Sequence, residues 1–473
     1  MRQGRTQPGD PCRSCLSGVR VCQCRCVWRR CLMSHQQQFE ALVAVLKAAI
    51  SPTEHFTLAY DAEASDFIRF NHGQVRQAGS VQQVIATFKL IDDGRHANLE
   101  LTLSGDAETD QQRLVDALQQ LRETLPSLAR DPYLLPNTNA WQSSNVQDLP
   151  LPDSARVVEQ ISELAGDLDL VGFYAAGPLY RGFASSWGAL GWHHANSFNF
   201  DWSLFHENGQ AVKANYAGHD WSDEAFAQRF QQAREQLEFL GRPLHALKPG
   251  QYRAYLAPAA LDEVIGMLTW GGFSAQSLAS KRSPLQRLYD GETLFSPLVN
   301  FDEQVSGSLS PAFSREGYPR KDLKLIVDGQ ARYRLVDSSS AAEYDLPANG
   351  ADDGEGPSAL SIAGGSLELD QILARLGTGL YISNLWYLNF SDRAAARLTG
   401  MTRFATFWVE EGKIVAPVST IRFDDSAYSL LGSALEDLTK ERELILQSST
   451  YSQRQTGSIQ LPGALISRLT LTL

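Results

Sequence analysis

The sequence predicts an α+β protein, with an antiparallel or mixed sheet and its helices in the first half and a strand-rich second half. Short runs of alternating apolar residues end at the turn sequences Asn71–Gly73 and Asp92–Gly94, as expected of hairpins. Runs with helical spacing lie between these strands. The strongest, 222–241, has Ser222 at its expected N-cap and Gly241 at its expected end. No period of 20–50 residues repeats, which excludes solenoid folds.

In the first half, the opening helix is expected at 35–50, because Phe39, Leu42 and Leu46 share one helical face. The stretch 131–153 contains four prolines and little periodicity, so it is expected to be a long connection. The other elements expected in this half are strands at 55–61, 66–71, 81–92, 96–103, 169–176, 197–206 and 211–217, and helices at 107–125, 154–165 and 222–241.

The second half is expected to open with a strand at 250–258 and a helix from Leu261. That helix runs into Trp270, Gly271 and Gly272, which do not suit a helix interior. The remaining elements are expected as strands at 323–337, 379–388, 403–418 and 465–473, and helices at 366–376 and 426–440. With a boundary near Pro243, the sequence divides into a disordered extension (1–32), an N-terminal domain (33–242) and a C-terminal domain (243–473).

The first 32 residues differ in composition from the rest of the chain. They hold all six cysteines, seven arginines and one acid. Cys12-x-x-Cys15 admits a small zinc knot as an alternative, but no histidine lies among these cysteines and their spacing suits no common zinc site. A secretory signal does not fit, because no apolar region follows the arginines. The interpretation favoured here is a disordered extension, with the fold starting at Met33.

The residues after Leu32 form an acidic body without cysteine, with 35 basic and 53 acidic residues. This composition predicts a cytoplasmic protein that needs no disulfides. It argues against direct binding to nucleic acid, which would require a basic surface. No apolar run approaches the 18 or so residues of a membrane span.

The histidines give the first candidate site. None of the nine follows His245, and the densest group is His193, His194, His206 and His219. Neighbours on a strand point to opposite faces, and many aromatic residues surround this group, so packing is favoured over a metal site. Asp352, Asp353 and Glu355 lack the spacing of a calcium loop, and a solvated loop is favoured there. No nucleophile elbow, phosphate loop or dinucleotide fingerprint is present.

Three segments resemble the TldD/PmbA family. The clearest is GLYISNLWYLNFSDRAAARLTGMTRFATFWVEEGKIVAPVSTIRF at 379–423. The segments 325–350 and 283–303 are also similar to the family pattern, and the hairpin sequence DFIRFNHGQVRQAG is weakly similar. The positions that carry the pattern in the first segment are Gly400, Phe404, Phe407, Trp408, Val409, Glu410, Gly412, Lys413, Ile414, Pro417 and Val418.

The resemblance implies a metallopeptidase fold in which a helix of TldD-type members carries H-E-x-x-x-H, with two zinc-binding histidines and a glutamate that activates water. A cysteine near the C-terminus supplies a further ligand in those members. Aligned to this chain, the motif falls near Met267, Leu268 and Gly272, and no His or Cys follows His245. The departure matches the PmbA/TldE branch, so no catalytic or metal-binding residue is expected here.

The resemblance therefore implies a non-catalytic subunit that joins a TldD-type metallopeptidase subunit, as a heterodimer or else a homodimer, in a complex that degrades or trims small unfolded peptides. Zinc is expected in the TldD-type partner. The family label "modulator of DNA gyrase" is taken as an indirect role. The candidates for peptide binding or the interface are Trp386, Tyr387, Phe404, Phe407 and Trp408, with core packing as the alternative. Two other functions stay open: a stand-alone peptide-binding or scaffold protein, and an active enzyme with an atypical site.

Residues 1–32 share no composition with the body, so their removal should leave the fold intact. A chain that begins at Met33 should have the melting temperature and solubility of the full chain, as measured by calorimetry and centrifugation. A fall of several degrees in melting temperature would show that these residues pack on the fold.

Overall fold

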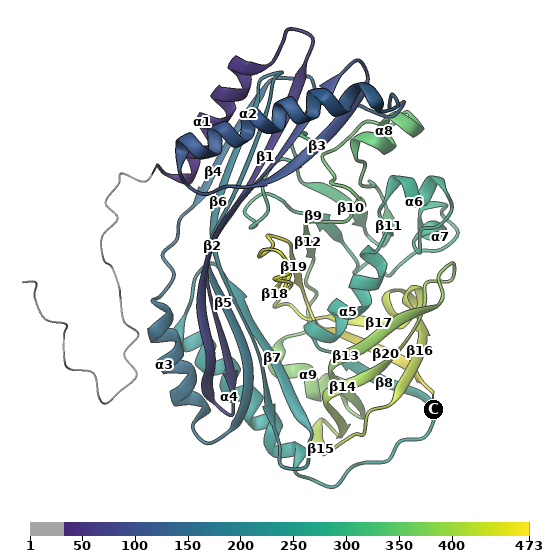
Figure 1. The fold of residues 1–473 in the computed structure, drawn as a ribbon. Helices are drawn as coiled ribbons and strands as arrows, with labels where there is room; N and C mark the ends of the chain where they lie inside the picture. Colours follow the sequence, from purple (N-terminus) through teal and green to yellow (C-terminus); the bar gives the residue numbers. More distant parts are fainter. Residues whose placement is uncertain (1–32, 473) are drawn as a thin grey trace, which may run out of the picture. The chain divides into compact units, whose positions relative to one another are not determined.

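The computed structural model describes residues 33–472, which belong to one compact unit. These residues form three sheets with helices packed on them, and they confirm the predicted α+β class (Figure 1). The extension expected at 1–32, together with the zinc-knot alternative, lies outside the described residues. No helix of the described part is long and apolar enough to cross a membrane.

The first sheet is built from long strands of the first half. Its order is β3-β2-β1-β5-β6-β4, with β7 paired to β6, and every pairing is antiparallel except that of β4 with β6. The bounds are β1 His55–Asn71, β2 Gln74–Asp92, β3 Arg95–Thr102, β4 Trp141–Gln147, β5 Asp169–Ser185, β6 Ala189–Phe205 and β7 Ala211–Gly218.

Both predicted hairpin turns of this sheet are confirmed. His72 and Gly73 have φ of 50° and 68°, and Asp93 and Gly94 have the same pair of values. Two successive left-handed residues make a turn whose twist matches that of the flanking strands, and Asp or His before Gly tolerates this conformation. The turns fix the register of β1 on β2 and of β2 on β3.

Four helices cover the first sheet in two pairs, one pair at each end (Figure 1). The bounds are α1 His35–Ala49, α2 Ala107–Thr124, α3 Ser154–Ala165 and α4 Asp223–Leu240, with a short 3₁₀ turn, η1, at Leu125–Ser127. Each of the four helices begins with a side-chain cap, from Ser34, Asp106, Asp153 and Ser222 respectively. These caps satisfy backbone donors that would otherwise lack partners.

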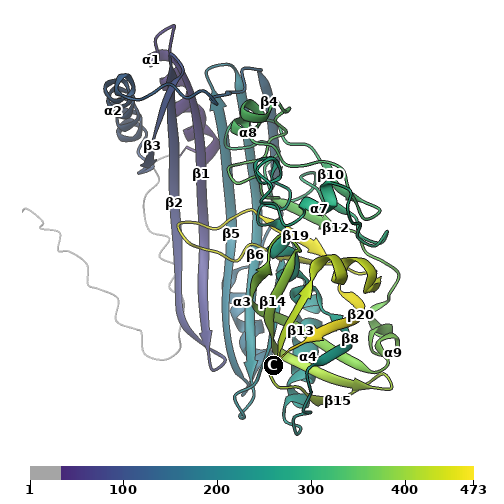
Figure 2. The ribbon, with the colours of Figure 1, turned by 90° about the vertical axis from the view of Figure 1, so that its right-hand side faces the viewer.

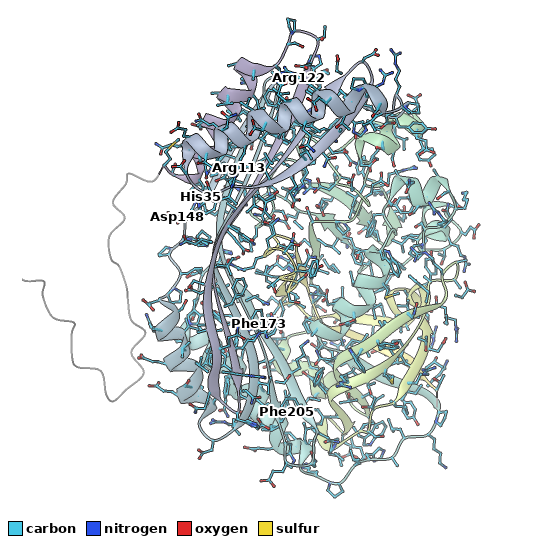
Figure 3. The ribbon with its side chains drawn as sticks, in the orientation of Figure 1. His35, Arg113, Arg122, Asp148, Phe173 and Phe205 are labelled. Atoms are coloured by element: carbon cyan, nitrogen blue, oxygen red, sulfur yellow. The ribbon has the colours of Figure 1, made fainter. Side chains whose placement is uncertain are left out.

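One ion pair ties α2 to the start of the sheet. Arg122, labelled in Figure 3, donates Nε and Nη2 to the two carboxylate oxygens of Glu54, at 2.7 and 2.6 Å. The bidentate pairing with Arg122 lowers the pKa of Glu54 to about 2. Helix α2 is thereby held to the turn that precedes β1.

The second half forms two sheets, with orders β11-β10-β9-β12-β19-β18 and β13-β8-β20-β16-β14-β15; β17 pairs with β20, and β13 also pairs with β14. The strand bounds are β8 Gly250–Leu256, β9 Phe301–Glu303, β10 Leu323–Val327, β11 Gln330–Ala331, β12 Ala359–Ile362, β13 Gly379–Asp392, β14 Arg397–Glu410, β15 Lys413–Pro417, β16 Arg422–Ser426, β17 Leu435–Leu438, β18 Glu443–Leu446, β19 Ser458–Leu461 and β20 Ala464–Leu471. The helix bounds are α5 Pro258–Thr269, α6 Ala275–Ala279, α7 Gln286–Tyr289, α8 Ser338–Tyr344 and α9 Ile372–Leu376, with a 3₁₀ turn, η2, at Leu369–Gln371.

The helix predicted at 426–440 is wrong. That stretch contains the end of β16, a five-residue π turn, η3, at Ser429–Ser433, and strand β17. Gly432 has a non-helical backbone, with φ −108° and ψ −110°. The following residues pair with the C-terminal strand β20, so tertiary pairing overrides the helical spacing of the apolar residues.

Several strands are also longer or more numerous than predicted. The gap expected at 62–65 is wrong, because these residues continue β1 and pair with β2, and Ala62 and Glu63 pair with β5 as well. The connection expected at 131–153 contains β4, which lies parallel to β6 as an edge strand. Strands β5 and β6 extend through 177–185 and 189–196, which the sequence left unassigned. The sequence of these segments shows little apolar alternation. They form strands because they pair with each other along nearly their whole length.

The cores of the two halves are not separate. Ala405 and Phe407 of β14 are fully buried in the same apolar cluster as Phe226 and Phe230 of α4. A strand from the second half therefore completes the core beneath a first-half helix. The domain boundary near Pro243 stays a prediction from the sequence, and it does not separate two independent cores.

A segment of the second half also reaches the first sheet. We call residues 447–457, which connect β18 to β19, the strap; in Figure 2 this loop extends from the second half across β5 to β1 and β2. Its Arg454 is only 5% exposed and donates to the Ser65 hydroxyl, the Gly177 carbonyl, and the carbonyl and hydroxyl of Ser197, at 2.7 to 3.3 Å.

The backbone of the strap is held as well. The Arg454 amide donates to Glu63, and its carbonyl accepts from Arg181 Nη2 at 2.9 Å. Arg181 in turn pairs with Asp61 at 3.1 Å. Burial lowers the pKa of Arg454 to about 10, which leaves the guanidinium charged at neutral pH. The strap is therefore fixed to the sheet by a buried network of hydrogen bonds around the Arg454 guanidinium.

Arg454→Met should lower the free energy of unfolding by about 3 kcal/mol, because removal of one member of a buried charge network leaves its partners unpaired. Arg332→Met is the matched control, since the Arg332 side chain is exposed and makes no hydrogen bond or ion pair with the described residues. The control should change stability by less than about 0.5 kcal/mol. Urea denaturation measures both, and equal stability of the two variants would contradict the role given to Arg454.

Candidate functional site

The candidate site is built around helix α5. The helix begins after Ala257 with Pro258 at its first position, and its buried face includes Leu261, Ile265 and Leu268. Proline suits this position because its missing N–H would have no helical partner. The apolar face anchors α5 in the main core of the second half.

The double glycine predicted to break this helix ends it. Trp270 leaves the helical conformation with ψ of 81°, and Gly271 has φ of 75°. At Gly272 a Cβ atom would lie 1.9 Å from the Leu268 carbonyl oxygen, so only glycine fits. Trp270 is left 65% exposed, and its carbonyl accepts a hydrogen bond of 2.6 Å from Arg393.

The place predicted for the degenerate zinc motif does not fit this geometry. A six-residue motif starting at Met267 would lie half beyond the helix, which ends at Thr269. Glu263 is the only glutamate of α5, and aligning the motif on it puts Asp262 and Met267 at the two histidine positions. Leu268 is fully buried and Met267 packs against the core.

Neither of these two alignments of the motif gives a site that fits zinc. Neither provides a histidine or cysteine, and the part of the chain that the structure describes contains no group of three or more His, Cys, Asp or Glu that could hold a metal ion. Asp262 alone cannot replace the ligand set of a catalytic zinc site.

A groove of about 410 Å³ runs beside the helix. One wall is α5, through Asp262, Gly266 and Thr269. The other consists of residues from β18, β19 and β12, of Pro357 before β12, and of the two ends of the strap. This volume lies in the range of ligand-binding pockets. Most of the lining side chains are apolar, and Asp262 is the only charged residue among them.

Asp262 is unusual within the groove. Its half-buried carboxylate makes no hydrogen bond or ion pair with the described residues. Burial raises the pKa of Asp262 to about 6, and the neighbouring Glu263 adds to the shift, while Lys213 acts in the opposite direction. At neutral pH the groove therefore presents a carboxylate that no cation neutralises by contact.

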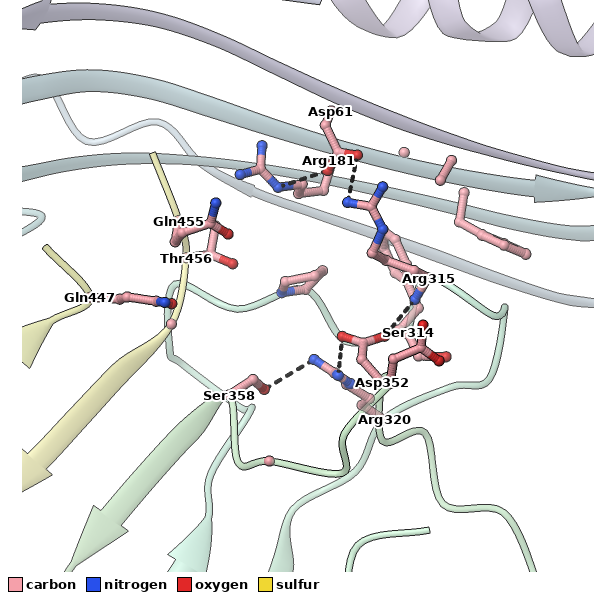
Figure 4. Close-up of a pocket in the computed structure, with 18 of the residues that line it drawn as sticks. Asp61, Arg181, Ser314, Arg315, Arg320, Asp352, Ser358, Gln447, Gln455 and Thr456 are labelled. Atoms are coloured by element: carbon pink, nitrogen blue, oxygen red, sulfur yellow. Dashed lines mark hydrogen bonds and ion pairs between the residues drawn. The ribbon is translucent and has the colours of Figure 1, made fainter. Parts of the chain in front are cut away.

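The groove continues into a second, polar compartment of about 270 Å³, shown in Figure 4. The two spaces share Pro357, Gln447 and Gly457 in their linings. In the compartment, Asp61 pairs with Arg181 at 3.1 Å and with Arg315 at 2.8 Å. Arg320 pairs with Asp352 at 2.6 Å. The strap contributes Gln453, Gln455 and Thr456, so the docked strap forms a wall of this compartment.

Two acidic residues of the loop 352–355 form hydrogen bonds within the protein. Asp352 pairs with Arg320 and accepts the Arg315 amide, and Glu355 is buried, where it accepts from Ser274, Gln276 and Asp337. Asp353 is exposed. The fully solvated loop expected there is therefore wrong for Asp352 and Glu355, which order the loop through hydrogen bonds.

The histidine group is not assembled into a site. His193 is fully buried, with Nε2 donating to the Leu309 carbonyl at 2.9 Å and Nδ1 accepting from Asn145 at 3.4 Å. His194, on the other face of β6, stacks on Tyr180 with ring centroids 4.5 Å apart. His206 accepts from the Asn208 amide within its own turn. These contacts match the packing interpretation.

The predicted aromatic candidates divide into two sets. Phe407 is fully buried in the core, and Trp408 stacks on His245, so both serve packing. Trp386 and Tyr387 are 44% and 74% exposed, and the guanidinium of Arg403 lies over the rings of Trp386 and Phe404, at 4.3 and 5.2 Å.

The exposed aromatics sit on irregular backbone. Tyr387 and Phe404 both have φ of 58°, which is costly for an aromatic residue, and the β13–β14 register shifts beside Tyr387 and beside Phe404. Such bulges redirect side chains and frequently mark functional surfaces. We refer to Trp386, Tyr387, Arg403 and Phe404 as the hairpin patch.

Sequence reasoning missed Asp262, Asp61, Arg181 and Arg454. A signal exists for one of them: Arg181 interrupts a mostly apolar strand sequence, where a charge is retained only if it is paired. No comparable signal marks Arg454, because the strap has no periodicity.

Comparison with known proteins identifies the class. Residues 249–473 match the family model described as "PmbA/TldA metallopeptidase C-terminal domain". A segment of the chain is 30% identical, over 161 residues, to Metalloprotease PmbA of Escherichia coli O157:H7. The match covers 33% of this chain and 32% of that relative, so the chain spans about a third of the length of the curated relative it matches.

The fold is similar to that of solved structures over almost the whole chain. TldE from Thermococcus kodakarensis matches with a TM-score of 0.75 and 14% identity, over 92% of this chain and all of that one. A Thermotoga maritima protein named as a candidate modulator of a DNA gyrase matches with a TM-score of 0.72 and 14% identity, over 93% of this chain and all of that one. At this identity the likeness concerns the fold.

The match of residues 249–473 defines a metallopeptidase-related protein. Together with the segment similar to Metalloprotease PmbA, this match supports the TldD/PmbA family as the group that the chain resembles. The resemblance inferred from the sequence is thereby confirmed.

The buried His193 should make the protein sensitive to acid. Burial lowers its pKa to about 4 from an ordinary 6.5, so between these values the unfolded chain takes up a proton that the folded chain does not. Stability should fall as the pH drops from 6.5 to 4, by at most about 3 kcal/mol from this residue. In His193→Gln this part of the pH dependence should be absent, whereas His219→Gln should keep it. Urea denaturation at several pH values tests this, and parallel profiles for His193→Gln and the unaltered protein would contradict it.

Proposed function

We propose that this chain is a PmbA/TldE-like subunit of a TldD-type metallopeptidase complex that degrades or trims small unfolded peptides. In this proposal the chain binds peptide and partner but does not cleave. The observation that carries it is α5, which lines a groove of peptide-binding size but offers no set of metal ligands. Zinc then belongs to the TldD-type partner, and the assembly is a heterodimer; a homodimer is the alternative.

The groove supports the peptide-binding part of the proposal. Strand β18 is the outermost strand of its sheet among the described residues, and Ile445 and Leu446 from it line the groove. An extended peptide added beside such a strand gains backbone hydrogen bonds, which tolerate many sequences, while apolar walls hold its side chains. Both properties suit unfolded peptides of varied sequence.

The hairpin patch supports the assembly part. Exposed Trp and Tyr side chains, stacked with an arginine, are the residue types that carry most of the binding energy in protein interfaces. A permanent complex would bury about 2,000 Å² or more, so the patch would be the centre of a larger contact. Phe407 and Trp408 would support the hairpin from beneath without touching the partner.

We place this activity in the cytoplasm, where a chain whose residues after Leu32 lack cysteine needs no disulfides. Direct binding of nucleic acid is not part of the proposal, because the net charge of −12 opposes it. The gyrase-related names of relatives would then reflect an indirect effect of peptide processing.

The chain alone should leave an unfolded peptide intact, and it should co-purify with a TldD-type subunit from the same organism and change its cleavage rate. Trp386→Ala with Tyr387→Ala should weaken complex formation at least about tenfold, since each is an exposed aromatic anchor. Tyr333→Ala is the control, because this exposed tyrosine lies outside the hairpin. Size-exclusion chromatography and a peptide-cleavage assay give the two readouts.

The alternatives give different results in the same experiment. A stand-alone peptide-binding or scaffold protein would bind peptide without forming a complex with the TldD-type subunit. An enzyme with an atypical site would cleave peptide unaided. Unimpaired assembly of the folded double variant would remove the hairpin patch from the interface and leave the proposed subunit role in place.

A further inference from the structure

The groove beside α5 has one chemical feature that peptide backbone binding does not use. Asp262 projects from the helix into the groove lining, and its carboxylate has no hydrogen bond or ion pair among the described residues. The side chains of α5 that follow it on this wall, Ile265 and Thr269, are uncharged.

The opposite wall does not compensate this charge. Its members from β18 and β19 include Ile445, Leu446 and Ile459, and its polar members are the uncharged Gln447 and Ser458. Glu263, the next residue of α5, adds a second negative charge nearby. Lys213 influences Asp262 from a distance but forms no ion pair with it.

The arginines of the neighbouring compartment are already committed. Arg181 and Arg315 pair with Asp61, and Arg320 pairs with Asp352. The positive charges of the compartment are therefore paired with carboxylates, whereas the carboxylate of Asp262 in the groove has no paired cation between the apolar walls. A ligand cation would gain an ion pair there, and its aliphatic stem would lie against the apolar walls.

We propose that Asp262 makes the groove selective for peptides that carry lysine or arginine, by pairing its carboxylate with the cationic side chain of the bound peptide. This inference rests on the proposed peptide-binding function and names its preferred substrate class. One carboxylate suits an ammonium or guanidinium group better than a metal ion, which would need further ligands that the described residues do not supply. The chain would thus deliver basic peptides to the complex in preference to neutral ones.

The test uses the full chain and two fluorescent, N-acetylated unfolded peptides that differ only in one central residue, lysine or norleucine. Fluorescence anisotropy should give about tenfold tighter binding of the lysine peptide at low salt, the effect of one charge-assisted hydrogen bond in a partly buried site. The preference should shrink in high salt. A norleucine peptide with a free N-terminus tests whether a terminal ammonium occupies the same place.

Asp262→Asn should abolish the preference for lysine and leave binding of the norleucine peptide unchanged. Glu123→Gln, an exposed position on α2 that changes the net charge equally, should keep the preference. Equal binding of both acetylated peptides to the unaltered chain would overturn the inference, as would a preference that survives Asp262→Asn. If a free N-terminus restores tight binding of norleucine while lysine has no effect, the side-chain assignment is overturned in favour of the terminus.

These outcomes separate the inference from the proposed function. Binding of both peptides without preference removes the role of Asp262 alone, and the chain can still assemble with a TldD-type subunit. Failure of both peptides to bind removes the inference together with the peptide-binding part of the proposed function.

Discussion

The site depends on the buried charge network around Arg454. This arginine holds the strap against the first sheet, and the strap in turn supplies walls to both the polar compartment and the groove beside α5. Its partners Glu63, Ser65 and Ser197 come from strands far away in sequence, so the site forms only when the two halves have docked. A charge buried this deeply is tolerated because the guanidinium donates to Ser65, Gly177 and Ser197. The network therefore specifies one docking geometry, which apolar contacts alone would leave less defined.

Helix α5 forms one wall of the groove. The glycine pair at 271–272 ends the helix, and the apolar face anchors it, so the groove keeps its wall. The groove-facing residues of α5 are Asp262, Ile265, Gly266 and Thr269, and none of them is a histidine or a cysteine. A single carboxylate can bind a cation but cannot activate water in the way a metal does. In the proposed function, this wall serves to bind peptide, and cleavage is assigned to the TldD-type partner.

The sequence predicted the α+β class, the four first-half helices and both hairpin turns, because caps and left-handed turn residues are local signals. It failed where pairing across the molecule decides the structure. The apolar residues of 426–440 have helical spacing, yet residues 435–438 of this stretch form a strand that pairs with β20. Phe407 was a candidate for peptide binding or the interface, with core packing as the alternative, and it lies in the core under α4. Asp262 could not be identified from the sequence, because an unpaired carboxylate is defined by what surrounds it. Arg454 was missed for the same reason.

The central claim is that this chain has the fold of a metallopeptidase family without its metal. The most direct test is elemental analysis of the purified protein beginning at Met33, after exposure to excess zinc and extensive buffer exchange. Less than about 0.1 zinc per chain is the result expected if α5 carries no ligand set, because a single carboxylate holds zinc too weakly to survive buffer exchange. About one tightly held zinc per chain would contradict the claim and restore the reading of an enzyme with an atypical site.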